Sequence, residues 1–211
     1  MVKLVAITKP LVEEADLTPE EFITYIARVS NPSNQLSKDT RLVNYLIKHK
    51  HWSPFEHVFL TFEIVTTRGI SAQILRHRSF TFQEKSARYS SDMHITVPEL
   101  RMQAARNRQG SDPEPVNPEE FVERMESHLS KGLELYNEAI GMGIAKETIR
   151  GILPLSTETT LYMSGSLRSF IHYMQLRCEP ETQKEHREIA EAIKAIIAEQ
   201  FKVLTEALNE Q

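Results

Sequence analysis

A segment of fourteen residues, 76–89, contains most of the side chains in this chain that are suited to chemistry. It reads Arg-His-Arg-Ser-Phe-Thr-Phe-Gln-Glu-Lys-Ser-Ala-Arg-Tyr. Guanidinium groups bind phosphates and planar acceptors through paired hydrogen bonds, so this segment is typical of a site for a nucleotide. The alternative is a solvated basic loop. The ordered spacing, together with two arginines far along the chain, Arg150 and Arg177, favours the binding site.

The distribution of charge separates the same region from the rest of the chain. The formal net charge is -4, but residues 68–108 contain eight Lys or Arg against three Asp or Glu, which gives +5 there and leaves -9 elsewhere. A basic middle within an acidic protein favours a small anionic ligand over a long nucleic-acid groove. A nucleic-acid-binding module, with Phe80, Phe82 and Tyr89 stacking on bases, is the alternative from another class.

Length and composition predict one globular domain spanning residues 1–211. The chain has 40% hydrophobic residues, enough for a sizeable core. No run of about 18 apolar residues occurs, so no membrane span is expected, and the N-terminal residues resemble a first strand more than a signal peptide. The single cysteine, Cys178, excludes an internal disulfide and fits a cytoplasmic location.

The elements that must position the chemical side chains are expected from hydrophobic periodicity and from cap and turn residues. Strands are expected over residues 2–8, 57–66 and 157–162, with a short one over 94–97. Helices are expected from Thr18 onward, over 37–50, over 69–75, from Asn117 to about Ile144, over 167–176 and over 181–208. The arginine-rich segment is expected to be a loop, and residues 111–118 a surface linker.

The order of these elements sets the fold class. Strands separated by irregular lengths, without βαβ alternation, favour an α+β domain in which long helices cover an antiparallel-type sheet. No Gly-rich turn of the dinucleotide or P-loop kind is present, so side chains must hold any nucleotide. Thr18-Pro19-Glu20-Glu21 and Asn117-Pro118-Glu119-Glu120 are both predicted to cap a helix.

Three more motifs accompany the arginine-rich segment. They are His51-Trp52-Ser53-Pro54-Phe55-Glu56-His57, Arg150-Gly151-Ile152-Leu153-Pro154 and Leu176-Arg177. Together with Arg76-His77-Arg78, Thr81, Gln83, Ser86 and Arg88-Tyr89, they resemble the flavin-dependent thymidylate synthases over roughly residues 28–183. Thr81 stands where that family has serine and Gln83 where it has asparagine, and both keep a hydrogen-bonding group.

The resemblance implies a reaction and an assembly. Methylenetetrahydrofolate would deliver a methylene group to dUMP, FAD reduced by NADPH would supply a hydride, and the products would be dTMP and tetrahydrofolate. The implied partners are small molecules, with no nucleic acid and no membrane. The implied assembly is a homotetramer with active sites where subunits meet. A family member that binds FAD or nucleotide without turnover is a further alternative.

The resemblance also implies roles for individual residues. Those implied to contact dUMP are Gln73, Arg76, Glu84, Ser86, Ala87, Arg88, Arg150 and Arg177. Those implied to contact FAD are Ser53, Glu56, Arg76, His77, Arg78, Glu84, Ser166, Arg168 and His172, with His51 near the flavin and folate. Arg177 is the implied catalytic residue, because its charge would favour loss of the imide proton of the pyrimidine. Members commonly have asparagine at 166 and 172 and histidine at 181.

Other chemistries find less support in the sequence. Ser86 has no recognisable base and orienting group, so it is interpreted as a ligand-positioning hydroxyl and not as a nucleophile. A lone cysteine such as Cys178 is more often buried than reactive. His49, His51, Glu56 and His57 show no ligand spacing for zinc, so no metal site is expected.

Overall fold

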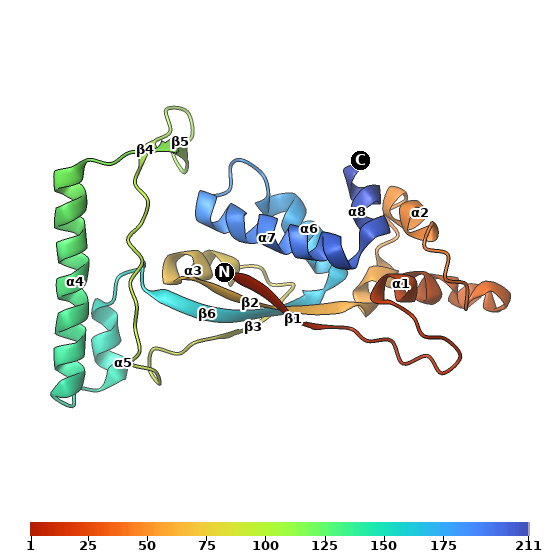
Figure 1. Cartoon of the computed structure of the whole chain (residues 1–211), viewed down its shortest axis with the longest axis horizontal. Coiled ribbons are helices and arrows are strands. Elements are labelled where there is room, and N and C mark those ends of the chain that lie inside the picture. Colours follow the sequence, from red (N-terminus) through yellow and green to blue (C-terminus); the bar gives the residue numbers. More distant parts are fainter. Residues whose placement is uncertain (211) are drawn as a thin grey trace.

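The computed structural model describes residues 1–210 and is built on one four-stranded sheet (Figure 1). Its strands lie in the order β1 (Val2–Ile7), β2 (Phe59–Thr67), β6 (Glu158–Ser166) and β3 (Thr81–Glu84), and all neighbours are antiparallel. The predicted α+β class with an antiparallel sheet is therefore confirmed. The arginine-rich segment is not all loop, because its middle pairs with β6 as strand β3.

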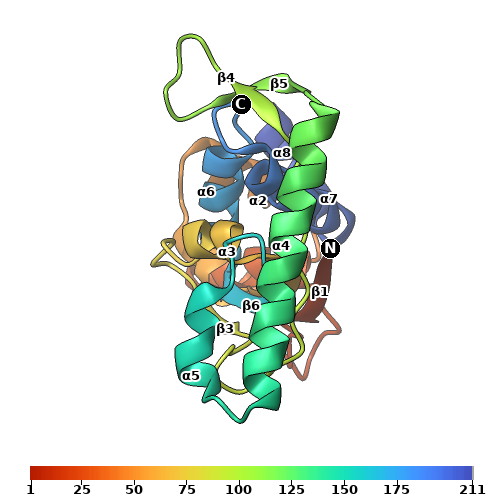
Figure 2. The same cartoon turned by 90° about the vertical axis from the view of Figure 1, so that its left-hand side faces the viewer.

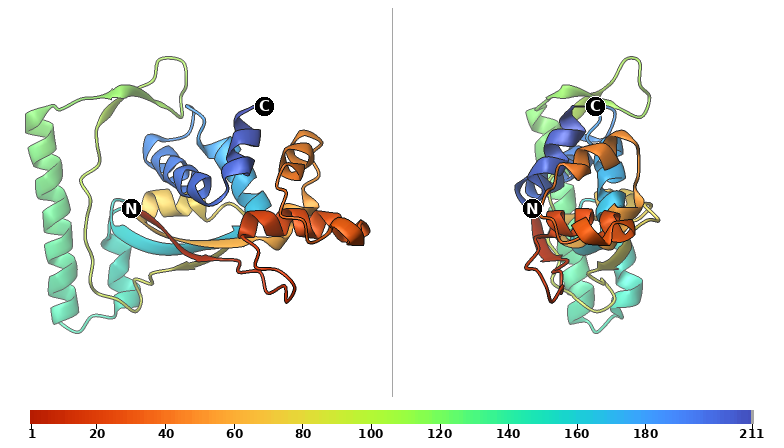
Figure 3. Two further views of the ribbon diagram at one scale, coloured as in Figure 1. Left: turned by 45° about the vertical axis from the view of Figure 1, so that its right-hand side comes forward. Right: turned by 90° about the vertical axis from the view of Figure 1, so that its right-hand side faces the viewer.

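Alternation along the central strands decides which face of the sheet is covered. In β2, Leu60, Phe62 and Ile64 are buried, whereas Phe59 is exposed. Helices α3 (Arg68–Ile74), α6 (Leu167–Arg177) and α7 (Lys184–Gln200) all lie on one side of the sheet (Figures 1 and 3). The buried side chains pack beneath them in one hydrophobic core, since a strand with period-two alternation presents one apolar face.

The C-terminal helix predicted over 181–208 is divided in the structure. Helix α7 ends at Gln200, and α8 (Lys202–Asn209) follows after Phe201, whose φ of -133° is extended and not helical. The Phe201 ring is fully buried in the core, and α8 packs against α2 (Leu42–Lys48). Burial of one aromatic ring thus breaks a helix that the apolar period alone would continue.

The first helix, α1 (Pro19–Ala27), begins as the sequence predicts. The Thr18 hydroxyl accepts from the Glu21 backbone N–H at 3.2 Å, and the Glu21 carboxylate accepts from the Thr18 N–H at 2.8 Å. The buried carboxylate of Glu20 accepts from the Leu204 N–H at 2.8 Å, and burial raises the pKa of Glu20. This contact ties the first helix to the last one.

The helix predicted over 37–50 is shorter than expected. Helix α2 starts only at Leu42, because the carbonyls of Ser37 and Asp39 accept from the buried Arg28 guanidinium, each at 2.6 Å. These two bonds tie residues 37–39, which are not helical, to the turn that contains Arg28. Short 3-10 turns connect these elements, namely η1 (Arg28–Ser30), η2 (Pro32–Asn34) and η3 (Ser53–His57).

An arm stands away from the helical layer (Figures 1 and 2). It consists of the hairpin β4 (Arg101–Gln103) and β5 (Ser111–Pro115), the long helix α4 (Glu119–Gly141), the short helix α5 (Lys146–Ile149) and the turn η4 (Arg150–Ile152). A small second core, built around Ala87, Met93 and Tyr136, joins α4 and α5 to the loop after β3. No helix within residues 1–210 combines the length and the apolar character needed to cross a bilayer.

Four predictions between residues 94 and 144 were wrong or incomplete. The cap predicted at Asn117 is absent, because Pro118 occupies the cap position without a side-chain hydrogen bond. Helix α4 ends at Gly141, and Gly143, with φ of +80°, turns the chain into α5. The 111–118 linker contains β5. The strand expected over 94–97 is reduced to one bridge between Ile95 and Thr157.

Candidate active site

The loop after α3 is anchored by one aromatic ring. Phe80 is buried, with its ring centroid 4.8 Å from that of Phe170 and 5.8 Å from that of Tyr173. The ring also lies directly over Gly165 of β6, where an added Cβ would come within 2.5 Å of it. This packing fixes the chain on one side of His77 and Arg78, so the segment that carries them is not a free loop.

The Arg177 guanidinium bonds to the imidazole of His77. Its Nε donates to Nε2 of His77 at 2.9 Å, across a hundred residues of sequence. Burial, and then the charge of Arg177, lower the pKa of His77, so the ring is neutral and its proton is assigned to Nδ1. Among residues 1–210, no hydrogen bond uses the two terminal nitrogens of Arg177, which leaves them available to a ligand.

The N-terminal end of α6 carries a second set of polar groups. The Glu56 carboxylate, from η3, accepts from the Ser166 hydroxyl at 2.5 Å and from Arg168 at 2.8 Å. These two contacts, the hydroxyl first, lower the pKa of Glu56. The ring of His172 lies edge-on to Trp52 at 5.1 Å. Ser166 also accepts from the Ser169 N–H, so serine at this position caps α6 while it bonds to Glu56.

We call these groups the α6 cluster, because they lie along that helix or bond to it. The cluster comprises Glu56, His77, Ser166, Arg168, Tyr173 and Arg177. Ser169 of the same helix donates to the Ser79 carbonyl at 3.4 Å, which links the arginine-rich segment to the N-terminal end of α6. Ser53 lies one turn before Glu56 in η3. Among the residues expected to contact FAD, a single copy of the chain therefore joins Glu56, Ser166 and Arg168 by hydrogen bonds, with Ser53 and His172 on the same two elements.

A different set of residues gathers at the start of α5, and we call it the α5 cluster. It comprises Ser86, Ala87, Arg88, Lys146, Glu147 and Arg150. Arg88 forms an ion pair with Glu147 at 3.2 Å, and Nε of Arg150 donates to the Glu147 carbonyl at 3.4 Å. Lys146 donates to the Tyr89 carbonyl at 2.8 Å. An open cavity of about 990 Å³ lies between the turn after β3 and α5.

The α5 cluster also includes the main chain of residues 86–88. Ala87 is buried against the second core, so only its main chain can reach a ligand. The Ser86 hydroxyl accepts from the Arg88 N–H at 3.3 Å and thereby shapes the turn. Converging N–H groups beside guanidinium are a common arrangement for binding a phosphate.

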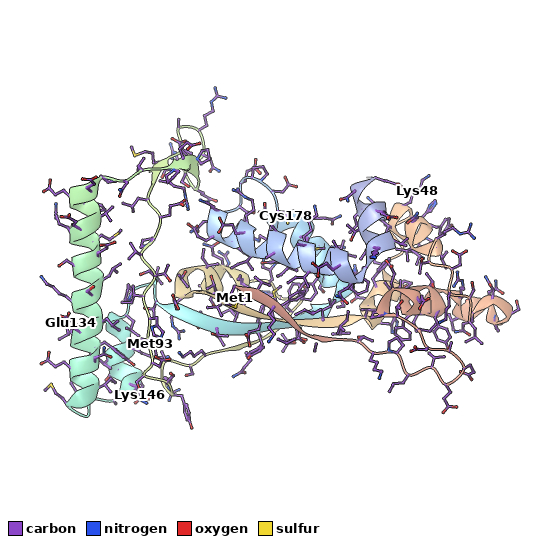
Figure 4. The ribbon with its side chains drawn as sticks, viewed as in Figure 1. Met1, Lys48, Met93, Glu134, Lys146 and Cys178 are labelled. Carbon is purple, nitrogen blue, oxygen red and sulfur yellow. The ribbon has the colours of Figure 1, made fainter. Side chains whose placement is uncertain are left out.

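The two clusters occupy different ends of the molecule. Strand β3 runs from the loop at α6 to the turn at α5 (Figure 1). Figure 4 shows the same separation, with Lys146 of α5 far from Cys178, which directly follows Arg177. Arg88 and Arg150 therefore lie together, while Arg177 lies at the other cluster. Arg76, next to His77, is exposed. One copy of the chain does not gather the four arginines around a shared cavity.

Two expected site residues, Glu84 and Gln73, belong to neither cluster. Glu84, on β3, accepts from the Ser71 hydroxyl at 2.8 Å and lies 3.6 Å from the Arg68 guanidinium. Gln73, on α3, donates to the Gln183 side chain at 2.7 Å. Expected contacts of both residues with dUMP stay predictions. His51 and Arg78 are exposed, as a ligand-contacting residue can be.

Several residues at the site were not singled out from the sequence. Lys146 and Glu147 organise the α5 cluster, while Tyr173, Gln183 and His186 support the α6 side. Only the polar run Gln183-Lys184-Glu185-His186 at a helix start could have drawn attention. Their roles depend on contacts between residues far apart in sequence, which periodicity does not report.

The structure also bears on the alternatives. Phe80 is 8% exposed and Phe82 packs on the core, so of the three proposed stacking rings only Tyr89, 88% exposed, is free to contact a base. Burial raises the pKa of the half-buried Cys178 thiol, which disfavours a thiolate nucleophile. Within residues 1–210, no three His, Cys, Asp or Glu side chains gather as a metal site would require.

Comparisons with known proteins agree on one family. A family model described as thymidylate synthase complementing protein matches residues 11–201. The chain is 49% identical to a probable flavin-dependent thymidylate synthase of Paramecium bursaria Chlorella virus 1, over 98% of each chain. It is 46% identical to the flavin-dependent thymidylate synthase of Synechocystis sp., over 99% of each chain.

A solved structure shows the same fold. The crystal structure of the UMP/dUMP methylase PolB from Streptomyces cacaoi, bound with 5-Br dUMP, matches with a TM-score of 0.81. The sequence identity is 26%, and the match covers 100% of this chain and 94% of that chain. The similarity therefore extends over the body, the arm and both clusters.

Proposed function

This chain belongs to the thymidylate synthase complementing protein family, and from that premise we propose that it is a flavin-dependent thymidylate synthase that methylates dUMP to dTMP. The observation that carries the proposal is the match over residues 11–201, which includes both clusters. The single domain, residues 1–211, would contain all the chemistry that one copy contributes.

The chemistry of the α6 cluster fits a flavin nucleotide. A dinucleotide cofactor needs cations for its phosphates, an acceptor for its ribose hydroxyls and apolar surface for its rings. Arg168 and the exposed Arg78 are the cations, Glu56 is a carboxylate held ionised, and Trp52 is an aromatic neighbour. Ser53, Ser166 and His172 add hydrogen-bonding groups. Bound here, FAD would supply the hydride that completes the methyl group.

Arg177 would act on the pyrimidine. Its bond to neutral His77 fixes one edge of the guanidinium and leaves the other edge free. A positive charge about 4 Å from the imide stabilises the anionic ring by roughly 4 kcal/mol at an effective dielectric of about 20, before screening by solvent. Loss of the imide proton makes the ring carbon electron-rich. We therefore assign Arg177 as the catalytic residue.

The α5 cluster would bind the phosphate of dUMP. Arg88 pairs with the Glu147 carboxylate, Arg150 bonds to the Glu147 main-chain carbonyl, and Ser86 and Arg88 line the cavity beside α5. The base and the phosphate of one nucleotide must lie within a few ångströms of each other, whereas one copy holds these two clusters apart. The α5 cluster of a second copy therefore completes each site, which is consistent with a homotetramer whose active sites lie between subunits.

Two co-substrates complete the proposed reaction. Methylenetetrahydrofolate would donate the carbon, with the exposed His51 near the flavin and the folate. NADPH would reduce the flavin. All of these partners are small molecules, and the cytoplasmic location expected from the single cysteine stays a prediction.

Purified protein provides the direct test. We expect a yellow preparation, or one that becomes yellow on reconstitution with FAD. With dUMP, methylenetetrahydrofolate and NADPH it should form dTMP, detected by chromatography, and omission of any one reactant should abolish the product. A protein that takes up FAD and dUMP but never forms dTMP would be a member that binds without turnover, and the proposed reaction would be wrong.

A further inference from the structure

One histidine differs from the other seven in its surroundings. His186, in the first turn of α7, is fully buried, whereas His77 is half-buried and the remaining six are exposed. Its Nε2 lies 3.0 Å from the hydroxyl of Tyr173, which is itself 2% exposed. Its Nδ1 lies 3.4 Å from the side-chain oxygen of Gln73, a long hydrogen bond. No step of the proposed reaction uses either the His186 ring or the Tyr173 hydroxyl.

A chain of hydrogen bonds runs from His186 through Gln73 and Gln183 to Glu185, and the donor in each bond can be assigned by starting from Glu185. The Glu185 carboxylate accepts from Arg101 at 2.6 Å, and its ion pair with Arg101 keeps it an acceptor. Gln183 must therefore present its NH2 group to Glu185, at 2.9 Å. Its oxygen then faces Gln73 and accepts from the Gln73 NH2 group at 2.7 Å.

The same logic continues inward to the buried histidine. Because the NH2 group of Gln73 faces Gln183, its oxygen faces His186 and can only accept. The imidazole proton must then be on Nδ1, and Nε2 must accept from the Tyr173 hydroxyl. Burial, and next the charge of Arg177, lower the pKa of His186 to about 4, so the ring stays neutral at neutral pH.

We propose that His186 is a positioning residue: its Nδ1–H holds in place the Gln73 oxygen, which the bonds from Glu185 turn inward, and so fixes the Gln73 NH2 group outward, toward an oxygen of the bound pyrimidine nucleotide. Gln73 and Gln183 line a cavity of about 570 Å³ beside α3. Each NH2 group uses one proton within the network, which leaves a second donor on each. The proposal rests on the proposed function, because it takes a uridylate as the ligand of Gln73.

The assigned tautomer can be tested without any ligand. Nitrogen-15 spectra of the imidazole rings should show His186 neutral, with the proton on Nδ1. Glu185→Gln should give a mixture of tautomers, because a neutral amide at 185 can donate or accept and the network loses its fixed direction. A ring protonated on Nε2 in the unmodified protein would overturn the proposal, whatever the enzyme turns out to do.

Two substitutions separate positioning from stability. In His186→Asn, an amide nitrogen takes the place of Nδ1 and can still donate to Gln73, but Tyr173 loses its acceptor. In His186→Gln, the amide lies near Nε2 and keeps Tyr173 paired, but Gln73 loses its donor. The asparagine variant should be the less stable of the two and yet bind dUMP within about twofold of the unmodified protein. The glutamine variant should bind it about fivefold more weakly, the effect of one lost hydrogen bond.

Deoxyuridine identifies the oxygen that Gln73 contacts. If the acceptor is the phosphate, the fivefold difference should vanish with deoxyuridine, and if it is a base carbonyl, the difference should persist. Either result supports the proposal. If the asparagine variant, which should be the less stable one, also binds dUMP more weakly than the glutamine variant, then His186 is only structural and the proposal is wrong. An unmodified protein that binds no dUMP would instead count against the proposed function.

Discussion

The two clusters differ in how firmly the chain holds their charged groups. In the α6 cluster, Arg177 bonds to a half-buried ring, and Glu56 accepts from two directions. In the α5 cluster, the ion pair joins side chains of Arg88 and Glu147 that are 63% and 58% exposed. Such a surface pair contributes only about 0–1 kcal/mol, so Arg88 can exchange Glu147 for a phosphate at little cost. The α6 cluster is suited to fixed chemical geometry and the α5 cluster to exchangeable anion binding.

The largest effect is expected from Arg177 of the α6 cluster, the proposed catalytic residue. Arg177→Ala should lower kcat by about 100- to 1000-fold, the usual effect of removing one group that stabilises a developing negative charge. Flavin absorbance after purification should be unchanged, because the assigned flavin contacts do not include Arg177. A matched control is Arg41→Ala, which removes an 88% exposed arginine paired with Asp39 and should change kcat by less than about twofold. Unchanged kcat in Arg177→Ala would remove the catalytic assignment.

The next largest effect should appear in the free energy of unfolding at low pH. The pKa of His186 is about 4 in the folded chain and near 6.5 when unfolded, so the unfolded chain binds the additional proton between these values. Stability is therefore lost as pH falls from about 6.5 to 4, by about 3 kcal/mol from this residue. Urea unfolding at several pH values should show this loss, and His186→Asn should lose less over the same range. An equal loss in both would contradict the assignment.

Arg88 of the α5 cluster should affect binding more than chemistry. Arg88→Ala should raise KM for dUMP about 10- to 100-fold, because a charged hydrogen bond contributes about 1.5–3 kcal/mol, while kcat should fall much less than in Arg177→Ala. Glu147→Gln should lower KM, since it removes the competing carboxylate. Steady-state kinetics of the two variants checks both directions. If kcat falls in Arg88→Ala while KM for dUMP stays constant, Arg88 acts on the chemical step and the proposed difference between the two clusters is wrong.

The smallest effect is expected where the Phe80 ring packs on Gly165 of β6. Gly165→Ala would place a Cβ 2.5 Å and 2.9 Å from two atoms of the Phe80 ring. Overpacking of this kind should lower the free energy of unfolding by about 1–3 kcal/mol, and Tm by several degrees. The control is Gly132→Ala in α4, where nothing lies within 4 Å and stability should rise by about 0.5–1 kcal/mol. Equal Tm shifts in the two variants would contradict this account of Phe80.

Local signals predicted much of the fold. The capping box at Thr18 and the apolar alternation of β2 both depend on neighbours in sequence, and both are present. The late start of α2 and the break at Phe201 were not predictable, because each depends on a distant partner. Arg28 holds the carbonyls that would otherwise begin a helix, and the core takes up the Phe201 ring.

The site divides in the same way. Residue types and motif spacing singled out Arg76, Arg88, Arg150 and Arg177 as one set, since they require only the sequence. The bond between Arg177 and His77 spans a hundred residues, and the ion pair between Arg88 and Glu147 forms only after α5 has folded against the turn. The sequence implied a site between subunits, but it did not show how one copy divides the four arginines. That division depends on how the chain folds between Arg76 and Arg177.

Complementation between two impaired variants, assayed at a dUMP concentration near the KM of the unmodified protein, tests the central claim most directly. Arg177→Ala and Arg88→Ala, co-expressed with different affinity tags and purified through both, would form mixed assemblies. If each site combines the α6 cluster of one copy with the α5 cluster of another, random mixing leaves about a quarter of the sites without either substitution. We predict that dTMP formation recovers to about that fraction of the unmodified rate. Mixed assemblies no more active, at that dUMP concentration, than the average of the two variants alone would contradict a site shared between copies.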